Sequence, residues 1–563
     1  MRIPIPALRV LLIVALAFSL ALPLVLPFPT PAASQDGSGP IREPNLYGTV
    51  NIGSLNPLLC DNPACRRITS FLFPHLIGID PTTGQFTPSG DSTALAASWD
   101  VSADGTKYTI HLRDDLTWTD GTPITAYDVF YSGYFAITSR FVQSAELVDD
   151  YSIVFSLSEA NCSALNWLDF PVIPVHMFEP DFSNRLDSWL DAPLTEQVNA
   201  LFSSHANISP TVSAGIFAFD TLQPTEYIRL QAGDLGFSYE DVSGWDEAIA
   251  RFMAGDLNLL VNPPFNRRED IRAASGVQIV EYPGLMWSGI VLNFADPANP
   301  LSAYDDDGNL LDQGHHPLFS DPQVRRAMQF GIDVNTLIDS ALLGSGTVMA
   351  ANQPPSSWAA DSTLAPVPYD PDQARRILES AGWKDTNHDG IRECITCTTA
   401  DPGTLLSFEL LYDDMVSYHP ILVSLISQQL AQVGFYVYTA PVSYPPDYQY
   451  FDAYLFSATE SFPVNPDQSL SFTRAGDDLN GGSNYGSYFN PDIEDLFAQA
   501  KTVCDPTARA DLYHQIQSIL QSDQPYIWLF TVNDMLAVRD GVSGFDPYPQ
   551  APFWNILDWT VQQ

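Results

Sequence analysis

Helical segments alternate with short, apolar, strand-like segments in the second half of the chain. Residues 245–254 have a helical pattern and precede the apolar segment 257–261. Further on, the apolar segment 408–411 is followed by a helical segment at 421–433 and a strand-like segment at 435–438. Because alternating helices and buried strands pack as layers, with helices covering a sheet, the sequence predicts an α/β fold.

The length and the composition favour several folded domains. A chain of 563 residues is long enough for two or three domains, and 45% of its residues are hydrophobic and 12% aromatic. These fractions are typical of globular proteins and not of disordered chains. A deep cleft between two separately stable cores is therefore possible.

The N-terminal residues 1–33 have the pattern of a secretory signal. Arg2 and Arg9 precede an apolar stretch at 10–28, and small residues follow at 32–34. We therefore expect export, with the mature protein at the periplasmic or extracellular face of the cell membrane. The apolar stretch is also long enough to remain as an uncleaved membrane anchor.

The folded part is expected to begin after a linker rich in Gly, Pro and Ser at 34–44, with a strand at 46–52. Lipid attachment requires a cysteine directly after the signal. The first cysteine of this chain is Cys60, so a lipid anchor is disfavoured.

Acidic residues outnumber basic residues by 67 to 24, which gives a formal net charge of −43 at pH 7. The electrostatic field of so negative a protein repels nucleic acids and anionic lipid surfaces, so no nucleic-acid partner is expected. Two interpretations of the charge stay open. The field steers cationic solutes to the protein, or the acids keep an exported protein soluble in a salty or acidic habitat.

Six cysteines in an exported chain predict up to three disulfides. Two pairs are close in sequence, and the two cysteines left over would form a long-range pair that the sequence does not prove. The pairs are Cys60 with Cys65, Cys394 with Cys397, and Cys162 with Cys504. The Cys-x-x-Cys pair has no second such motif and no histidine at zinc-finger spacing, which favours a structural disulfide.

The stretch 99–129 combines tight turns, a strand and a helix start. Asp-Gly turns at 104–105 and 120–121 flank the alternating segment 107–112. Thr125 is the expected N-cap of a helix, with Asp128 at its third position. The order and spacing of Trp, Asp-Gly, Leu-Arg, Trp-x-Asp-Gly and Thr-Ala-x-Asp-Val here resemble the signature of extracytoplasmic solute-binding proteins.

The resemblance is to the class that includes the dipeptide, oligopeptide and nickel receptors of ABC importers, the bacterial family 5 type, and it covers residues 45–560. Leu-Asn-Phe at 292–294, followed by Pro-Leu-Phe and Val-Arg-Arg-Ala at 317–319 and 324–327, is similar to the start of the family's second lobe. The segment 370–383 resembles the next helix of the family.

Two features depart from the family pattern. Relatives usually have a Gly-Pro-Tyr type of turn where this chain has Gly-Ile-Phe at 215–217. The lipid-attachment cysteine is also missing, which leaves the mode of membrane tethering open.

The resemblance implies an α/β, two-lobed periplasmic-binding-protein-like fold of type II with an additional inserted α+β domain. By analogy, the first lobe comprises 45–80, 205–285 and 525–563, the inserted domain 81–204 and the second lobe 286–524. The same resemblance implies a monomer without a cofactor. It would bind a small molecule or a peptide between the lobes and deliver it to the permease subunits of an ABC transporter.

The segment 454–463 is similar to the family region where peptide-binding members place an acid for the α-ammonium group of the ligand. Glu460 falls at that position. A carboxylate that loses water when the lobes close would bind an ammonium group more strongly than a surface acid does. The alternative is that Glu460 caps a loop in solvent.

Several side chains near the expected hinge are further candidates for ligand binding. Trp287, Phe265, Phe462 and Tyr485 could stack on an amide or sugar plane, although such a ring more often packs in a core. Asn484 could form hydrogen bonds with backbone-like ligand groups, or it belongs to a plain Gly-rich turn.

Two motifs bear on metal binding. Asp-Thr-Asn-His-Asp-Gly at 385–390 matches the first half of a calcium loop. The twelfth position, where a bidentate acid belongs, is Thr396, so an Asp- and Asn-rich turn is expected instead of a tight site. His315 and His316 have no partner at ligand spacing and are expected in a surface loop.

No catalytic motif was found: the sequence contains no His-Glu-x-x-His, Gly-x-Ser-x-Gly, phosphate-binding loop or Gly-x-Gly-x-x-Gly. We therefore predict a binding protein and not an enzyme. A secreted hydrolase that uses a pair of carboxylates is the alternative from another class. Oligosaccharides and metal chelates remain alternatives to a peptide ligand.

Overall fold

The computed structural model describes residues 2–4, 39–60, 62–88, 94–137, 141–178, 201–305, 307–443, 450–477, 482–548 and 551–562. Apart from residues 2–4, the secretory signal expected at 1–33 lies outside the described residues, as does the first part of the expected linker, 34–38. Within the described ranges, no helix is both long and apolar enough to cross a bilayer.

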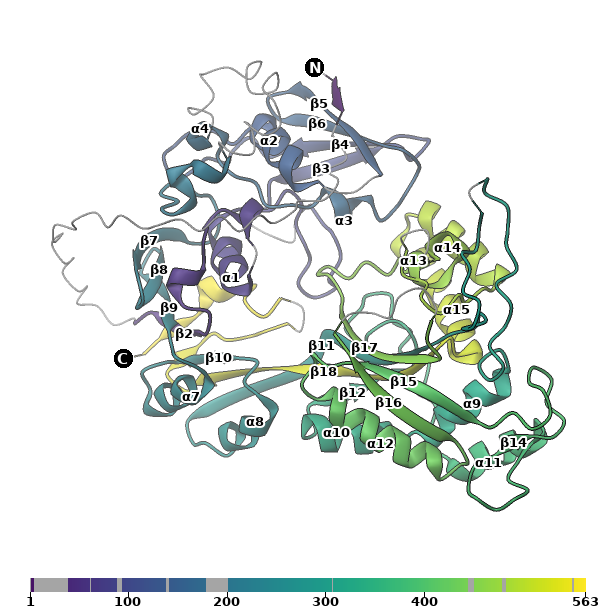
Figure 1. Cartoon of the computed structure of the whole chain (residues 1–563). Coiled ribbons are helices and arrows are strands. Elements are labelled where there is room, and N and C mark those ends of the chain that lie inside the picture. The colour runs from purple at the N-terminus through teal and green to yellow at the C-terminus, as the bar shows by residue number, and fades with distance from the viewer. Residues whose placement is uncertain are drawn as a thin grey trace.

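The first sheet has the strand order β2-β9-β8-β7 and contains the start of the folded chain. Helix α1 packs beside it on the left of Figure 1. The elements are β2 (Ile41–Asn45), β7 (Ala218–Gln223), β8 (Tyr227–Ala232), β9 (Leu235–Asp241) and α1 (Pro63–Leu72).

The prediction of a strand at 46–52 is wrong, because β2 ends at Asn45. Asn45 Nδ2 donates a hydrogen bond of 2.8 Å to the carboxylate of Asp241, and the same carboxylate accepts bonds from the backbone N–H and the hydroxyl of Thr49. These bonds turn the chain at Gly48, where φ is +75°, a conformation that suits glycine. The folded chain therefore begins inside the range that was expected to be a linker.

The second sheet has the order β1-β5-β6-β4-β3 and lies at the top of Figure 1, with helix α2 against it. Its strands are β1 (Arg2–Pro4), β3 (Ala96–Val101), β4 (Lys107–Leu112), β5 (Val142–Asp149) and β6 (Ser152–Leu157). The helices beside it are α2 (Ala126–Ala136), α3 (Ala164–Leu168) and α4 (Val175–Phe178).

The predicted start of α2 is confirmed. Thr125 and Asp128 form a capping box, in which the Asp128 carboxylate accepts the backbone N–H of Thr125 at 2.9 Å. The other oxygen of Asp128 accepts the N–H of Val175 at 3.0 Å. Burial raises the pKa of this carboxyl group above its usual value. Asp128 therefore also fixes α4 to α2.

The third sheet, order β10-β18-β11-β17-β15-β16, with β12 on β18, joins the left and right halves of the molecule in Figure 1. Its strands are β10 (Leu259–Val261), β11 (Val277–Leu292), β12 (Gly346–Val348), β15 (Ser407–Asp413), β16 (Tyr436–Val442), β17 (Ala453–Thr459) and β18 (Tyr526–Arg539). Strand β11 is continuous over 16 residues, from Val277 to Leu292.

Strands β11 and β18 form an antiparallel ribbon between the two halves. They pair from Val277 with Arg539 in the left half to Val291 with Tyr526 in the right half. The register shifts between Pro283 and Trp287, so the backbone pairing is interrupted near the middle of the ribbon.

Helices cover both halves. Beside the ribbon on the left are α7 (Trp245–Ala254) and α8 (Phe265–Arg272). On the right are α9 (Pro322–Gly331), α10 (Val334–Leu342), α11 (Pro371–Ser380), α12 (His419–Ala431), α13 (Ser469–Phe472), α14 (Pro491–Thr502) and α15 (Pro506–Asp523). The strand, helix and strand expected at 408–411, 421–433 and 435–438 are β15, α12 and β16, and they form a βαβ unit because β15 and β16 are parallel and α12 connects them. The short hairpins are β13 (Trp383–Lys384) with β14 (Glu393–Cys394), and β19 (Val542–Ser543) with β20 (Thr560–Val561).

The hydrophobic cores follow the two halves. One continuous cluster joins residues of the first and second sheets, including Phe71, Phe237 and Ile110. A second cluster fills the space between the third sheet and the helices on the right, including Phe408 and Leu430. Because the first two sheets share a core, they are held together as one body.

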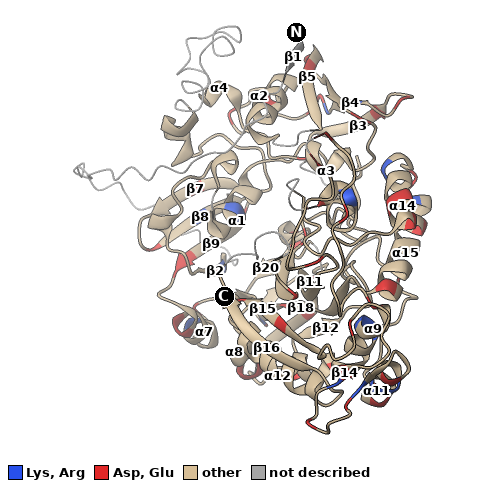
Figure 2. Ribbon diagram, turned by 45° about the vertical axis from the view of Figure 1, so that its right-hand side comes forward, with Lys and Arg blue, Asp and Glu red and all other residues tan. Residues whose placement is uncertain are grey.

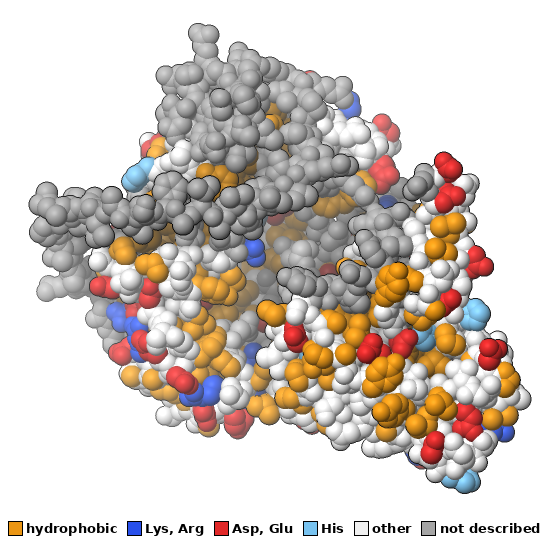
Figure 3. Space-filling model, viewed as in Figure 1, with side chains coloured by type: hydrophobic (Ala, Val, Ile, Leu, Met, Phe, Trp, Pro, Cys, Tyr) orange, Lys and Arg blue, Asp and Glu red, His pale blue; other side chains and the backbone are white. Residues whose placement is uncertain are grey.

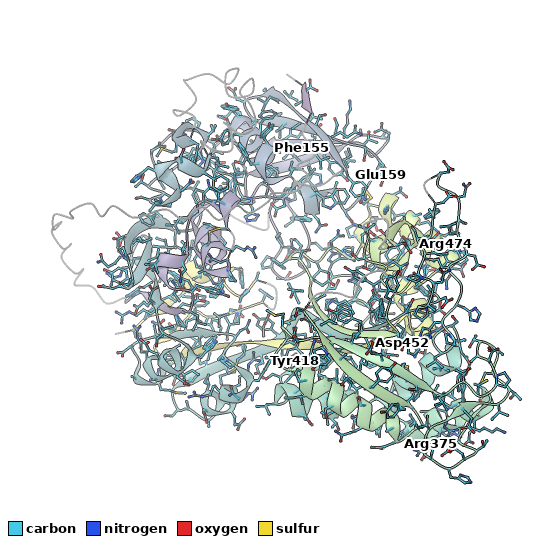
Figure 4. All side chains as sticks on the ribbon, in the orientation of Figure 1. Phe155, Glu159, Arg375, Tyr418, Asp452 and Arg474 are labelled. Carbon is cyan, nitrogen blue, oxygen red and sulfur yellow. A yellow bond between two sulfur atoms is a disulfide. The ribbon has the colours of Figure 1, made fainter. Side chains whose placement is uncertain are left out.

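The prediction that His316 lies in a surface loop is wrong, because this residue is only 2% exposed. Its Nδ1 accepts the backbone N–H groups of Leu318 and Phe319, each at 3.1 Å. The proton is therefore on Nε2, which donates to Asp452 Oδ1 at 3.1 Å. Asp452, labelled in Figure 4, thereby fixes the loop before α9 to the third sheet.

The six cysteines form the pairs Cys60–Cys65, Cys394–Cys397 and Cys162–Cys504. The third pair spans 342 positions of sequence and connects the body of the second sheet to the right half. Hydrogen bonds surround it, because Cys162 N donates to Lys501 O at 2.7 Å and Arg509 donates to Cys162 O at 3.1 Å.

A buried polar network lies where the ribbon enters the right half. The hydroxyl of Tyr418, labelled in Figure 4, contacts Ser288 Oγ at 3.2 Å and Ser457 Oγ at 3.1 Å. His419 Nδ1 donates to the backbone oxygen of Asp413 at 2.9 Å, so Nε2 accepts from Ser457 Oγ at 2.9 Å. Burial lowers the pKa of His419 to about 4, so this ring stays neutral at ordinary pH.

The long-range disulfide should contribute more stability than a local one. In the chain-entropy account, removing Cys162–Cys504 by a double substitution to Ser costs up to about 5 kcal/mol, against about 2 kcal/mol for Cys60–Cys65. Urea unfolding followed by tryptophan fluorescence measures both variants. If the Cys162→Ser/Cys504→Ser variant is no less stable than the Cys60→Ser/Cys65→Ser control, the interbody bond is not a main support of the fold.

The neutral His419 predicts a loss of stability in acid. An unfolded imidazole has a pKa of about 6.5, so as the pH falls below that value the unfolded state binds a proton that the folded state does not. Stability is therefore lost from about pH 6.5 down to about pH 4, by up to about 3 kcal/mol. Buried carboxyl groups with raised pKa values oppose this trend in every variant.

A comparison of Tm at pH 7 and pH 4.5 isolates the contribution of His419. The decrease in Tm should be smaller in His419→Gln than in the wild type, while the exposed control His205→Gln should match the wild type. An equal decrease in all three proteins would contradict the assignment.

Candidate ligand-binding site

A cavity of about 540 Å³, partly open to solvent, lies at the end of the ribbon in the right half. It is bounded by β11, β17 and β18 on one side and by the segment around α13 on the other. The residues that line it are Trp287, Asp413, Ser443, Tyr454, Phe456, Ser457, Ala458, Thr459, Glu460, Ser461, Asn465, Asp467, Gln468, Leu470, Ser471, Phe472, Ser483, Tyr485 and Tyr526.

Glu460 is the charged group whose environment is most unusual in this cavity. It directly follows β17, and its backbone N–H donates to Leu285 O at 3.0 Å. Glu460 Oε1 accepts hydrogen bonds from Trp287 Nε1 and Gln468 Nε2, both at 2.9 Å. Burial raises the pKa of this carboxyl group, and the two hydrogen bonds oppose the increase.

No basic side chain balances Glu460 among the described residues that line the cavity. The sequence also contains no Lys, Arg or His between His419 and Arg474. A partly buried carboxylate that is held by neutral donors lacks a counter-ion, which raises the cost of its charge. The arrangement is therefore suited to a ligand that brings a positive charge.

Aromatic rings form one wall beside Glu460. The ring of Trp287 lies 5.1 Å from Phe456, and Phe456 lies 5.6 Å from Tyr526, both in edge-to-face contacts. Phe472 lies 5.1 Å from Tyr526. Because these rings hold one another, the wall is rigid and presents apolar surface to a bound molecule.

The register of the sheet positions Trp287. In the antiparallel pairing of β11 with β17, Trp287 is opposite Ala458, two positions before Glu460. A Cβ atom at Gly289 would lie only 3.1 Å from the Trp287 ring and 3.3 Å from Ile527 O. Glycine at 289 therefore leaves the space that the indole needs in order to reach the carboxylate.

The structure brings three of the six expected site residues into one cavity: Trp287, Glu460 and Tyr485. The other three, Phe265, Phe462 and Asn484, do not line it. Phe462 is near in sequence but 37% exposed outside the cavity.

Asn484 and Phe265 have other roles in the structure. Asn484 is 2% exposed, and its amide donates to the backbone oxygens of Thr473 and Tyr488 and accepts the N–H of Tyr488. This full set of bonds makes Asn484 part of a turn. Phe265 starts α8 and packs under the Arg268 guanidinium, 4.7 Å from the ring centre.

Several lining residues were missed at the sequence level. Tyr454 and Phe456 alternate along β17, and Tyr526 starts β18, so a period-two pattern of aromatic residues was the available signal. Gln468, which bonds Glu460, follows an irregular loop and had no such signal. Asp413 and Asp467 add two more acids to the lining.

The acids of the cavity belong to a surface on which acids are widely distributed. Figure 2 shows Asp and Glu residues on many elements, including α14 and α15, and few Lys and Arg residues. On the face shown in Figure 3, acidic groups are separated by hydrophobic and neutral side chains and do not form a single patch. What distinguishes Glu460 is its burial and not its charge.

The chain matches the family model described as "Bacterial extracellular solute-binding proteins, family 5 Middle" over residues 92–480. It is 24% identical over 552 residues to the oligopeptide-binding protein AppA of Bacillus subtilis, covering 92% of this chain and 90% of the relative. It is 22% identical over 504 residues to a dipeptide-binding protein of Pseudomonas aeruginosa, covering 83% and 86%.

Solved structures show the same fold. The structure of Bacillus subtilis AppA in complex with a nonapeptide has a TM-score of 0.62, 21% identity, and coverage of 94% of this chain and 99% of that one. HbpA2 from Haemophilus parasuis has a TM-score of 0.72, 17% identity, and coverage of 93% and 100%. The two-lobed α/β fold expected from the sequence is confirmed by these likenesses. Since the family model covers more than half of its length, the chain belongs to family 5 of the bacterial extracellular solute-binding proteins.

Proposed function

We propose that this solute-binding protein captures a peptide by its free α-ammonium group at Glu460 and delivers it to the permease subunits of an ABC importer. The protein acts as a monomer near the membrane, and the peptide leaves chemically unaltered. The observation that supports the proposal is the partly buried Glu460 carboxylate, which has neutral donors on Oε1 and aromatic rings beside it.

An ammonium group suits this carboxylate for a physical reason. Both hydrogen bonds from the protein reach Oε1. Among the described residues no hydrogen bond to Oε2 is present, so this oxygen is available to a donor from the ligand. A charge-assisted bond in a site with little water is stronger than a neutral one. The pair also removes the cost of an uncompensated charge.

The aromatic wall suits the remainder of a peptide. Trp287, Phe456 and Tyr526 offer ring faces and edges that can pack on side chains or on amide planes. Because the wall is apolar, it favours no particular side chain strongly. Relatives in the family include an oligopeptide-binding and a dipeptide-binding protein, which supports a peptide as the ligand.

Binding would require that the two halves move. We propose that the first lobe (45–80, 205–285 and 525–563) and the inserted domain (81–204) move together, because their sheets share one hydrophobic core. The second lobe (286–524) would move against them at the ribbon, near the register shift between Pro283 and Trp287. Closure would then bury the ligand beside Glu460.

Loss of the Glu460 charge should weaken peptide binding. For a tripeptide with a free N-terminus, Glu460→Gln should reduce the affinity about 10- to 100-fold, which corresponds to about 1.5–3 kcal/mol for a hydrogen bond to a charged group. Isothermal titration calorimetry measures it. Glu226→Gln, in the exposed turn between β7 and β8, serves as the control and should bind like the wild type.

The same titration with an N-acetylated tripeptide completes the test. The acetylated peptide should bind weakly to the wild type, and Glu460→Gln should change that affinity little. Equal binding of free and acetylated peptides would remove Glu460 from the ammonium site. A ligand set that contains oligosaccharides and metal chelates, but no peptide, would overturn the peptide assignment, and turnover of any of them would indicate a hydrolase.

The Trp287 hydrogen bond should set the pH range of binding. The carboxylate form binds the ammonium group, so affinity falls as the pH decreases through the raised pKa of Glu460. The Trp287 bond lowers that pKa. In Trp287→Phe the loss of affinity should therefore begin at a higher pH than in the wild type. Calorimetric titrations between pH 4.5 and 8 measure the shift, and coincident pH profiles would contradict it.

A further inference from the structure

A short segment outside the ligand cavity, residues 352–358, supports the loop that precedes α13, the helix labelled at the right of Figure 1. None of this segment is among the described residues that line the cavity. Two of its side chains donate hydrogen bonds to backbone oxygens of the loop: Gln353 to Pro466 at 3.3 Å and Trp358 to Val464 at 3.2 Å. A third side chain, Asn352, bonds the side chain of Gln468, which in turn bonds Glu460. The segment therefore holds the loop and also contacts a residue of the site.

The amide group of Gln468 lies between Asn352 and Glu460. Its Oε1 accepts a hydrogen bond of 2.7 Å from Asn352 Nδ2. Its Nε2 donates to Glu460 Oε1 at 2.9 Å and, over a longer distance of 3.5 Å, to the backbone oxygen of Asn352. A chain of two hydrogen bonds therefore connects the side chain of Asn352 to the carboxylate of Glu460.

The chemistry of these groups fixes how the Gln468 amide is turned. An ionised carboxylate can only accept hydrogen bonds, and so can a backbone oxygen. If the amide were turned around, its oxygen would face the Glu460 carboxylate and the backbone oxygen of Asn352. Its NH₂ group would then face the NH₂ group of Asn352, and both contacts would be repulsive. Asn352 therefore permits only the orientation in which Gln468 donates to Glu460.

Stability alone does not explain an asparagine at position 352. The residue is 1% exposed. Its Oδ1 exposes less than 1 Å² and, in the part of the chain that the structure describes, has no hydrogen-bond partner. A buried acceptor without a donor costs free energy, and an apolar side chain of similar size would avoid that cost. An apolar side chain would not, however, supply the donor that Gln468 needs.

We propose that Asn352 is a positioning residue for ligand binding, because it holds Gln468 in the orientation that donates to Glu460 Oε1. The Oε2 atom of Glu460 then stays available to the ammonium group of a peptide. The inference rests on the function proposed for Glu460. Since Asn352 lies outside the cavity, its effect on the ligand passes through Gln468.

The proposal gives the direction of a pH effect. The hydrogen bond from Gln468 lowers the pKa of Glu460, whereas burial raises it. When Gln468 is no longer held, this bond weakens and the pKa of Glu460 rises further. The carboxylate form, which binds an ammonium group, is then lost at a higher pH as the solution is acidified. The other titratable groups that line the cavity are the same in every variant: Asp413, Tyr454, Asp467, Tyr485 and Tyr526.

Asn352→Leu removes the donor with little change of volume. At pH 7 it should bind a tripeptide with a free N-terminus about 3- to 10-fold more weakly than the wild type, as expected for the loss of one neutral hydrogen bond. Its affinity should also begin to fall at a higher pH. Isothermal titration calorimetry between pH 4.5 and 8 measures both effects. Gln353→Leu is the matched control, because it removes a bond from the same segment to the same loop and should keep the wild-type pH profile.

A double variant tests whether the effect passes through Gln468. Asn352→Leu/Gln468→Leu should bind like Gln468→Leu alone. The proposal is overturned if Asn352→Leu weakens binding equally in both backgrounds, or if Gln353→Leu shifts the pH profile as far as Asn352→Leu does. Circular dichroism confirms that each variant is folded. If Asn352→Leu does not fold, Asn352→Ala removes the same donor and takes its place.

A titration of the ligand-free protein separates this proposal from the peptide assignment. With isotope-labelled glutamate carboxyl carbons, the NMR signal of Glu460 is the one that Glu460→Gln lacks. Its midpoint should lie at a higher pH in Asn352→Leu than in the wild type, whether or not a peptide binds. Coincident midpoints overturn the role of Asn352. A shifted midpoint in a protein that binds no tripeptide supports the positioning of Glu460 by Asn352 and contradicts only the proposed ligand.

Discussion

The antiparallel pairing of β11 with β18 is the constraint on which the arrangement of the two halves depends. These strands carry the chain from the left half to the right half and back, and they are hydrogen-bonded to each other along their length. A ribbon of two strands is stiff along its axis but bends where the ladder is interrupted. The interruption between Pro283 and Trp287 lies directly before the indole that bonds Glu460. Bending of the ribbon and formation of the site therefore involve the same few residues.

The Cys162–Cys504 bond adds a second connection away from the ribbon. Its surroundings are polar and well bonded, since Ser163 Oγ donates to Asn465 Oδ1 at 3.0 Å and Asn166 donates to Pro463 O at 3.3 Å. Two bodies that are joined at a ribbon and at one further covalent point keep less freedom of relative movement than two bodies joined by the ribbon alone. Less entropy is then lost when the halves close on a ligand, which favours binding through preorganisation.

Local signals in the sequence were sufficient to predict helices and strands, but not to predict the ligand-binding site. The cap residue Thr125 starts the helix that it was expected to start, because an N-cap depends on residues within one turn. The prediction failed where distant contacts decide. The strand expected at 46–52 is replaced by a turn that is held by Asp241, nearly 200 positions away, and His316 is buried through a bond to Asp452.

The candidate site shows the same division. Glu460, Trp287 and Tyr485 could be chosen because the family resemblance and the aromatic pattern pointed to them. Asn484 could not be excluded, because its partners are backbone groups that meet it only in the folded turn. Gln468 could not be found, because its contact with Glu460 depends on the loop before α13. Sequence spacing predicts neighbours along one element, whereas the cavity is made by residues from several elements.

Burial, and not the total charge, can give this protein selectivity. A net charge of −43 attracts every cation, but at physiological salt that attraction fades within about 8 Å and does not distinguish one cation from another. Glu460 differs from the surface acids because burial raises its pKa and only neutral donors hold it. A small hydrated metal ion would have to give up its water there to one carboxylate among aromatic rings. A primary ammonium group also loses water when it enters the site, but its hydrogen-bond donors can bind Glu460 and neighbouring oxygens in exchange. The loss of water therefore favours an ammonium group over other cations.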